Sequence, residues 1–497
     1  MLMTWAIAGT YMTLLGVLAL YGAHRGFLLW ALRQNRAMEP QTSDTPHRRV
    51  TIQLPIYNEP AVTRRLIDAV AQIEWPADRL QIQVLDDSTD ITSAIVDQAV
   101  AQWVAKGVGI EVTRRSSRTG YKAGALAHGL QSATGEYIAI LDADFVPGTD
   151  FLTQLMPHFT QGVGMVQARW GHINRNESWL TRMQAMLLDA HFVIEHAARH
   201  QSGRFFNFNG TAGIWRKSCI LDAGGWEHDT LTEDLDLSYR AQMKGWRFIY
   251  LKDVVTPAEL PPDMNGFKSQ QHRWAKGSIQ TCMKMLGPIW RSKLPRIIKL
   301  EATAHLTANF AYLLLILLCV LVNPAMHPES GWVRTFVLDI PIFFATTISV
   351  GLFYVTAQIA INPSPLRWLR EVCYLPILLA LGIGMSVNNG KAVFEALMGK
   401  QSDFVRTPKY GIEKKRKDVR KAKYRALRSI APVFEVAFFF YFSYLVLHAL
   451  ASGNWIGVPF LFLFQVGFFF VAYGSLRHLL PAWILGNSEN EDAVLGA

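Results

Sequence analysis

The chain has 497 residues, of which 50% are apolar and 18% are charged. A soluble domain carries about 25% charged residues, so this chain is short of charge for its size, and its apolar content excludes a disordered or collagen-like protein. Its four cysteines have no pairing or metal-binding spacing, which excludes a disulfide framework and fits a reduced, cytoplasm-facing environment.

An apolar stretch opens the chain. Residues 3–24 are long enough to span a bilayer. They lack the basic start of a signal peptide and continue into aromatic and basic residues. We therefore expect an N-terminal transmembrane anchor over residues 1–32.

Residues 48–300 alternate strand and helix patterns. These patterns predict strands over 48–58, 80–88, 109–115 and 136–145, and helices over 59–73, 92–105 and 122–133. This order favours a mostly parallel sheet with helices on both faces, in which ligands bind at the carboxyl ends of the strands. We expect this α/β domain to occupy residues 45–265.

Two carboxylates, Asp142 and Asp144, follow the apolar strand YIAIL. Alternation along an extended chain aims both side chains the same way. Convergent carboxylates hold Mg²⁺ or Mn²⁺, which takes its remaining ligands from water and a diphosphate. Acidic pairs at strand ends also occur by chance, so this motif gains weight from its companions.

Further polar groups lie at the ends of neighbouring elements. Asp87 ends the preceding strand, where its carboxylate either contacts a nucleobase or ribose or caps the next helix. Pro55, Tyr57 and Glu59 end the first strand; Tyr57 suits stacking on a base, and Glu59 suits a ribose hydroxyl. Lys122, at a helix start, suits a diphosphate, and an ordinary surface lysine is the alternative.

Glu233 and Asp234 open a helical pattern. One positioned carboxylate there can act as the general base that deprotonates a sugar hydroxyl. The alternative is a pair of first-turn acids that only stabilise the helix dipole.

Two clusters combine aromatic rings with amide or guanidinium groups: residues 205–211, which include Asn209, Gly210 and Thr211, and residues 270–274, which include Gln270, Arg273 and Trp274. Such groups suit a sugar acceptor, and the guanidinium suits a diphosphate. Core packing is the alternative for the first cluster, and a structural amphipathic helix is the alternative for the second.

The C-terminal part carries four further apolar stretches of spanning length, at 303–323, 335–361, 431–451 and 455–479. Between the second and third of these, residues 399–428 hold twelve Lys and Arg against three acids, which accounts for nine charges of the net +10. This stretch is either a solvated linker or a cytoplasmic segment at an anionic membrane surface. Nucleic-acid binding is disfavoured because no recognition module accompanies the charge.

A sixth apolar stretch, 371–388, is interrupted by Pro376 and two glycines. If the α/β domain and the basic stretch both face the cytoplasm, two crossings must lie between them, and 303–323 and 335–361 supply both. We therefore expect residues 366–400 to lie along the cytoplasmic interface. Five spans then place the N-terminus outside and the C-terminus inside. The predicted order after the α/β domain is interfacial helices at 266–300, two spans at 301–361, the interfacial helix, a basic segment at 401–428, two spans at 429–480 and an acidic tail at 481–497.

In this order, the motifs LPIYNE, DDSTD, YKAGAL, DAD, FNGTAGIWR, TED and QQHRW resemble those of the membrane-integrated glycosyltransferases of family 2. The resemblance is strongest to the cellulose-synthase-like mannan and glucan synthases of plants, and VQARW, TRMQAM and MKGW sharpen it. It covers residues 48–285 strongly and the remainder by layout. It implies a GT-A fold, a nucleotide-diphosphate sugar donor, a divalent metal and inversion at the anomeric carbon.

The resemblance also implies roles for single residues. It assigns Asp87 to the base, Asp142 and Asp144 to the metal, Asp234 to the general base, and Gln270, Arg273 and Trp274 to the acceptor and the diphosphate. Residues 404–409 resemble the gating loop of polymerising members, with Phe404 at its start and Arg406, Thr407 and Lys409 as phosphate-side contacts.

The sequence thus predicts an inverting hexosyltransferase of the plasma (inner) membrane with a cytoplasmic catalytic domain. It would use UDP-glucose or GDP-mannose to elongate a β-linked glucan or mannan and move it across the membrane. A non-processive enzyme that adds one hexose to a lipid such as ceramide or diacylglycerol is the alternative. A transporter with a non-catalytic nucleotide-binding domain is disfavoured on the premise that no span carries a paired intramembrane charge.

Overall fold

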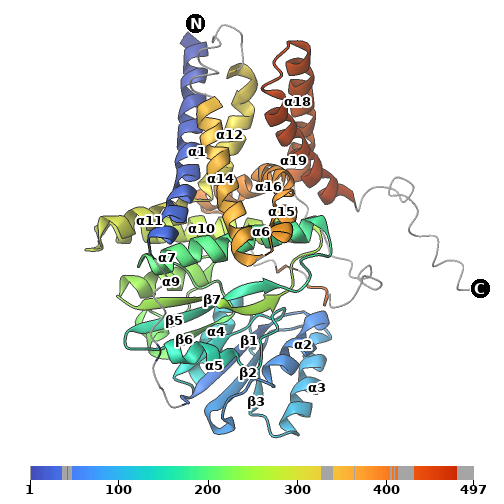
Figure 1. Cartoon of the computed structure of the whole chain (residues 1–497). Coiled ribbons are helices and arrows are strands. Elements are labelled where there is room, and N and C mark those ends of the chain that lie inside the picture. The colour runs from blue at the N-terminus through green and yellow to red at the C-terminus, as the bar shows by residue number, and fades with distance from the viewer. Residues whose placement is uncertain are drawn as a thin grey trace, which may run out of the picture.

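The computed structural model describes residues 2–35, 42, 47–325, 340–362, 364–402, 406–407, 409–411 and 430–477. Figure 1 shows an α/β domain below a group of upright helices, with a layer of further helices between them. The expected acidic tail, most of the basic segment and Phe404 lie outside the described residues.

A seven-stranded sheet forms the centre of the α/β domain, in the order β3-β2-β1-β4-β6-β5-β7 (Figure 1). The strands are β1 Val50–Ile56, β2 Leu80–Asp86, β3 Ile110–Thr113, β4 Tyr137–Ile140, β5 Val163–His172, β6 Gly213–Arg216 and β7 Arg247–Ala258. β6 pairs antiparallel with β4 and β5, and the other pairs are parallel. The predicted mostly parallel sheet is therefore confirmed.

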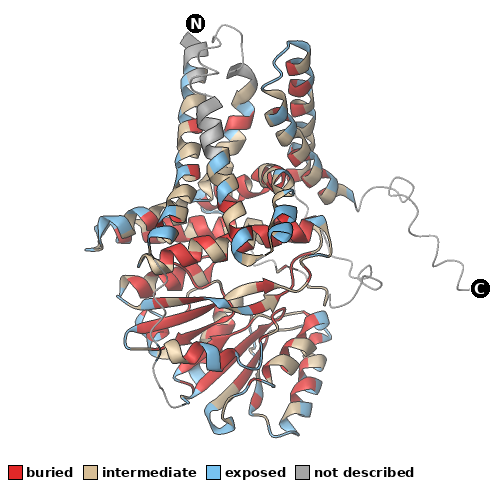
Figure 2. Ribbon diagram, in the orientation of Figure 1, coloured by how far each residue is buried: buried red, intermediate tan, exposed pale blue. Residues whose placement is uncertain are grey.

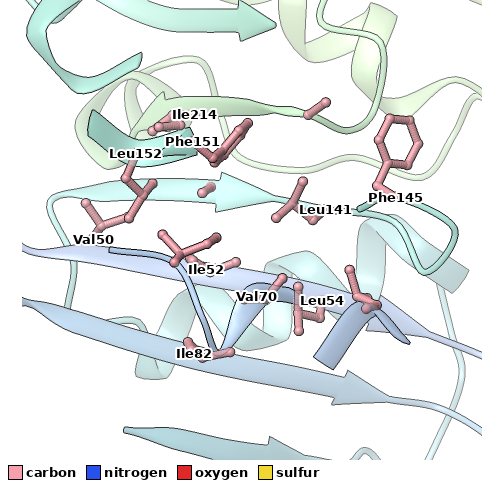
Figure 3. Close-up of a cluster of buried hydrophobic side chains, with 14 of the residues drawn as sticks. Val50, Ile52, Leu54, Val70, Ile82, Leu141, Phe145, Phe151, Leu152 and Ile214 are labelled. Carbon is pink, nitrogen blue, oxygen red and sulfur yellow. The ribbon is translucent and has the colours of Figure 1, made fainter. Parts of the chain in front are cut away.

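Helices cover both faces of this sheet, so its inner strands are buried. β4 is wholly apolar, whereas β1 and β2 also bury glutamines, and Gln53 donates to Gln83 Oε1 at 3.1 Å. α2 Pro60–Val70, α3 Thr92–Val104 and α5 Phe151–Leu155 pack on one face, and α4 Tyr121–Ser132, α8 Lys217–Asp222 and α9 Glu233–Met243 pack on the other. Figure 3 shows Val50, Ile52 and Leu54 of β1 in the core cluster on this face, with Val70 of α2 near Leu54. In Figure 2 the buried residues follow the strands.

The strand register brings the predicted polar groups to one edge of the sheet. β1 pairs in parallel with β2, where Ile56 lies beside Asp86, and with β4, where Gln53 lies beside Ile140. Tyr57, Asp87 and Asp142 therefore leave their strands at the same edge.

The middle layer consists of short or horizontal helices (Figure 1). Its members are α6 Trp179–Ala190, a π-helical turn His191–His196, α7 Ala197–Gln201, α10 Met264–Arg291, α11 Arg296–Thr307, α15 Pro365–Val372, α16 Leu375–Gly384 and α17 Ser386–Leu397. α10 begins where Asp263 Oδ1 accepts a hydrogen bond from the Gly266 amide at 2.8 Å. The QQHRW motif lies in the first half of this long helix, which also contacts α17 and the upright helix α19.

The upright helices are α1 Leu2–Gln34, α12 Phe310–Ala325, α14 Ile340–Ile361, α18 Ala431–Ala451 and α19 Val458–Leu476. Within the described residues, four helical stretches are long and apolar enough to cross a membrane: Gly9–Gln34, Pro365–Leu397, Ala431–Ala451 and Val458–Leu476. A fifth is added if the bent pair Arg296–Thr307 and Phe310–Val322 counts as one span.

The stretch Pro365–Leu397 passes this test as a whole but consists of three short helices. The longest, α17, has 12 residues and a length of about 18 Å, against about 30 Å of bilayer core. α16 is seen nearly end-on in Figure 1, while α1, α14 and α18 run upright. The location of residues 366–400 along the membrane interface stays a prediction.

One premise of the sequence analysis is wrong. Glu435, inside the apolar helix α18, is buried and lies 2.6 Å from Lys268 Nζ of α10. Ser475 of α19 also accepts a hydrogen bond from Lys268 at 3.0 Å. A helix predicted to span the membrane therefore does carry a paired charge, and its partner lies on the middle-layer helix α10. The pair was missed because its two halves lie 167 residues apart. The chemistry of the cavity at the strand ends must therefore distinguish an enzyme from a transporter.

Candidate active site

An open cavity of about 130 Å³ lies at the carboxyl ends of β1, β2 and β4. Most of the predicted site residues line it: Pro55, Tyr57, Asp87, Lys122, Asp142, Asp144, Asn209, Gly210, Glu233, Asp234, Gln270, Arg273, Trp274, Arg406, Thr407 and Lys409. Glu59 and Thr211 are buried next to these residues rather than in the lining. Residues as far apart in the chain as Pro55 and Lys409 thus converge on one cavity only after folding.

Lys122 links the strand-end acids to the FNG segment. Its Nζ lies 2.6 Å from Asp142 Oδ1 and donates to the carbonyl oxygen of Gly210 at 2.8 Å. Although burial favours the neutral acid, Lys122 holds the pKa of Asp142 below its ordinary value. Thr211 Oγ1 accepts from the Asp142 amide at 2.8 Å, so Thr211 supports this strand end from behind.

Asp144 is buried and faces the same cavity. Its Oδ2 lies 2.5 Å from Lys409 Nζ. Its Oδ1 is buried and has no hydrogen-bond partner among the described residues. A carboxylate oxygen without a hydrogen-bond partner is one that a hard divalent cation can coordinate, so Asp142 and Asp144 fit the metal site that the family resemblance implies.

Asp234 lies in the first turn of α9, and its Oδ1 accepts from the Leu235 amide at 2.8 Å. Burial and the neighbouring charge of Glu233 raise the pKa of Asp234 to about 7. A carboxylate with this pKa can exchange a proton near neutral pH, as a general base must. The positive φ of Gly210, +80°, brings its backbone so close that a Cβ there would lie 3.0 Å from Asp234 Oδ2.

At the ends of β1 and β2, two arginines that the sequence analysis missed hold the predicted residues Asp87 and Tyr57. Arg115 forms an ion pair with both oxygens of Asp87, with Nε 3.0 Å from Oδ1. The Arg118 guanidinium lies 3.4 Å from the ring centroid of Tyr57, the ring that was expected to stack on a base. Both arginines belong to the basic run RRSSR after β3, a signal that was present in the sequence.

Residues of α10 form another wall. Gln270, Arg273 and Trp274 all line the cavity, and the Trp274 ring centroid lies 6.4 Å from that of Trp170. Burial lowers the pKa of Arg273, whose charge interacts with Glu233 and the other cavity acids. The QQHRW motif therefore faces the strand-end acids across the cavity.

The described part of the predicted gating loop crosses the cavity. Arg406 donates to the carbonyl oxygen of Tyr57 at 2.6 Å and forms an ion pair with Glu59. Burial raises the pKa of Glu59 to about 7 despite this ion pair. Glu259 accepts from the amides of Tyr410 at 2.7 Å and Gly411 at 2.9 Å. No local pattern singled out Glu259, because its partners are backbone groups about 150 residues away.

A second acidic cluster, Glu227, Asp229 and Asp236, has oxygens close enough to hold a metal. Lys284 Nζ already lies among them, 2.5 Å from Glu227, 2.8 Å from Asp229 and 3.0 Å from Asp236. Both groups of acids thus have lysine partners, but Asp142 and Asp144 line the cavity and the acids of this second cluster do not, so the strand-end acids are the better metal candidates.

Residues 46–277 match the family described as "Glycosyltransferase like family 2". Over 454 residues the chain is 35% identical to a probable glucomannan 4-beta-mannosyltransferase of Oryza sativa subsp. japonica, covering 87% of this chain and 82% of that protein. It is 33% identical to a glucomannan 4-beta-mannosyltransferase of Cyamopsis tetragonoloba, again covering 87% and 82%. The chain belongs to glycosyltransferase family 2.

A solved structure agrees with this membership at the level of the fold. A mannosyltransferase of Pyrobaculum calidifontis, in complex with GDP-mannose and Mn²⁺, superimposes with a TM-score of 0.53 at 20% identity. The match covers 79% of this chain and 100% of that one. For this family 2 glycosyltransferase, the expected family, GT-A fold and enzyme class are therefore confirmed.

Proposed function

We propose that the chain is an inverting, membrane-bound hexosyltransferase that extends a β-linked mannan or glucan from a nucleotide-diphosphate sugar. The observation that carries this proposal is the convergence of Asp142, Asp144 and Asp234 on one cavity lined by Lys122 and Arg273. The named activity of the plant relatives supports a mannosyl or glucosyl product. GDP-mannose is the first donor to test, and UDP-glucose is the second.

On the donor side, Asp87 and Tyr57 contact the base, and Lys122, Arg273 and the loop residues Arg406 and Lys409 face the diphosphate. Asp142 and Asp144 would hold a divalent cation, Mg²⁺ or Mn²⁺, which when bound neutralises the charge of the diphosphate. Because Lys409 pairs with Asp144, this loop cation has to share or leave that carboxylate when a metal binds.

On the acceptor side, Gln270 and Trp274 hold the terminal sugar. Asp234 takes the proton of the attacking hydroxyl, and the hydroxyl oxygen forms the new bond to the donor C1. The bond from C1 to the diphosphate oxygen breaks, and its electron pair leaves with the nucleotide diphosphate. Attack opposite to the leaving group inverts the anomeric carbon.

The adjoining apolar helices favour product export through the membrane. α10 carries Gln270, Arg273 and Trp274 and contacts α19 and α17, so the acceptor side of the cavity adjoins the helix group. We propose the five-span topology with a cytoplasmic α/β domain, and with residues 366–400 along the interface. Labelling of single cysteines in the loops on each side of the membrane would test it.

The decisive experiment incubates the purified full chain and Mn²⁺ with GDP-mannose or UDP-glucose and sizes the product. A ladder of oligomers is expected, with none from Asp234→Asn. A single glycolipid would instead support the lipid-directed alternative. Binding of both donors without any transfer or hydrolysis would support the transporter reading and overturn the proposal.

A further inference from the structure

A chain of polar contacts runs from Glu195 through His191 to Asn209, which lines the cavity. The π-helical turn His191–His196 follows α6, and π turns are frequent at functional sites. His191 Nδ1 lies 2.9 Å from Glu195 Oε2, and His191 Nε2 lies 3.2 Å from Asn209 Nδ2. His191 and Glu195 were not singled out by the sequence, although the spacing of four residues fits a helical pair.

The hydrogen-bond network determines where the protons lie. Although burial favours the neutral acid, the hydrogen bond from His191 and the charge of Arg199 hold the pKa of Glu195 well below its ordinary value. An ionised Glu195 only accepts, so Nδ1 of His191 carries the proton and donates it to this carboxylate. His191 Nε2 lies 3.2 Å from the amide nitrogen of Asn209, which can only donate, so Nε2 is the accepting nitrogen of the ring.

This arrangement also determines the orientation of the Asn209 side chain. Its nitrogen points to His191, so its Oδ1 is on the other side of the amide. Oδ1 is buried and has no hydrogen-bond partner among the described residues, although Asn209 lines the cavity. The backbone is fixed as well, since the Asn209 amide donates to Gln167 Oε1 at 3.1 Å. An unpaired carbonyl oxygen of this kind is stabilised by a ligand hydroxyl.

The support of His191 is rigid. Arg199 lies 3.5 Å from Glu195 and donates to Glu301 at 3.0 Å, and Glu301 in turn pairs with His24 of α1 at 3.0 Å. Arg199 and Glu301 are both only 2% exposed in their side chains, so this chain of contacts has little freedom to rearrange.

We propose that His191, held by Glu195, is a positioning residue that orients the Asn209 amide so that its carbonyl oxygen accepts a hydrogen bond from a hydroxyl of the acceptor sugar. This inference rests on the proposed function. Gly210 follows Asn209 and packs close to Asp234, so the Asn209 amide and the proposed base would face the same end of the acceptor sugar. His191 itself touches neither substrate nor the reacting atoms.

The test compares His191→Leu with His191→Gln in the full chain. Leucine cannot accept from Asn209, whereas the glutamine side-chain oxygen can. With β-1,4-linked mannohexaose or cellohexaose as acceptor, His191→Leu should raise the acceptor KM and the oligosaccharide Kd about tenfold, which is the loss expected for one hydrogen bond. His191→Gln should recover most of this loss. The Kd for the nucleotide product, GDP or UDP, should stay within about twofold in both variants.

A double-mutant cycle separates positioning from general damage. In an Asn209→Leu background, His191→Leu should have no further effect on oligosaccharide binding, because the group that it orients is gone. The proposal is overturned if His191→Leu leaves oligosaccharide binding unchanged, if nucleotide affinity falls by the same factor, or if the effect persists in the Asn209→Leu background. Oligosaccharide binding is measured without turnover. Failure of the proposed function would appear as no sugar transfer by the wild-type chain, and it is therefore distinguishable from failure of the positioning role of His191.

Discussion

Lys122 Nζ lies 2.6 Å from Asp142 Oδ1, and the same ammonium donates to the Gly210 carbonyl at 2.8 Å. One cation therefore links the strand-end acid of β4 to the loop that packs against Asp234. The donor half and the base half of the proposed site share this contact.

Replacing Lys122 with methionine should weaken both stability and activity. The Asp142 carboxylate, 28% exposed, would lose its partner, so we expect a loss of about 1–3 kcal/mol in the free energy of unfolding. Transfer should fall about 100-fold because a cation facing the diphosphate is gone. Thermal unfolding and initial rates measure these effects.

Lys244→Met is the matched control, since Lys244 pairs with Asp222 at 3.3 Å on the surface, with side chains 51% and 47% exposed. We expect little change in the unfolding temperature and unchanged transfer there, because an exposed ion pair contributes little to stability. Equal effects in the two lysine variants would contradict the structural role of the Lys122 contact.

Asp234→Asn should reduce transfer by about 10²–10⁴-fold and leave donor binding intact, because the amide cannot accept the hydroxyl proton. Asp229→Asn, outside the cavity on an exposed loop, is the control and should stay near wild type. A rate for Asp234→Asn close to that of wild type would refute its role as base.

The pH profile gives an independent test of the same group. Burial and Glu233 raise the pKa of Asp234 to about 7, so below this pH the carboxyl holds a proton and cannot act as a base. The rate should therefore fall as the pH decreases through about 7. The apparent pKa of this profile belongs to the interacting pair Glu233 and Asp234. A rate that stays constant as the pH falls would contradict this assignment.

Metal removal should abolish transfer, and added Mn²⁺ or Mg²⁺ should restore it. Asp144→Ala should weaken the metal-dependent part of nucleotide binding, since it removes the buried, unpaired Oδ1. Glu227→Gln should not, because Glu227 lies outside the cavity lining and already pairs with Lys284. Full activity in chelator would show that the reaction needs no metal. A loss of metal dependence in Glu227→Gln alone would place the metal at the second acidic cluster.

Gly210→Ala tests the close packing of the FNG loop against Asp234. Gly210 has φ +80°, and a Cβ would lie 3.0 Å from Asp234 Oδ2 and 3.4 Å from Lys122 Nζ. Gly203→Ala is the matched control, with φ +65° and no atom within 4 Å of its Cβ position. Both variants should cost about 1 kcal/mol of backbone strain, and only Gly210→Ala should also reduce transfer, by about tenfold or more. Equal transfer rates in the two variants would contradict the predicted contact.

Much of the site was predictable because its residues follow strands or begin helices. Asp87, Asp142 and Lys122 stand directly at such ends, and a parallel sheet brings those ends to one edge. The residues that hold them were not predictable. Arg118 covers Tyr57 and Glu259 holds the backbone after Lys409 through contacts between distant segments. No local period records such contacts.

Periodicity and turn residues, which act between near neighbours in the chain, were sufficient to predict the alternating α/β order, the acids at the strand ends and the apolar helices. Packing alone decided that His191 meets Asn209 and that Lys268 meets Glu435. These pairs join side chains from separate helices and loops, and their distance depends on how the sheet, the middle layer and the upright helices pack together. A polar group in an apolar stretch shows only that a partner is needed, and the folded chain determines which partner it is.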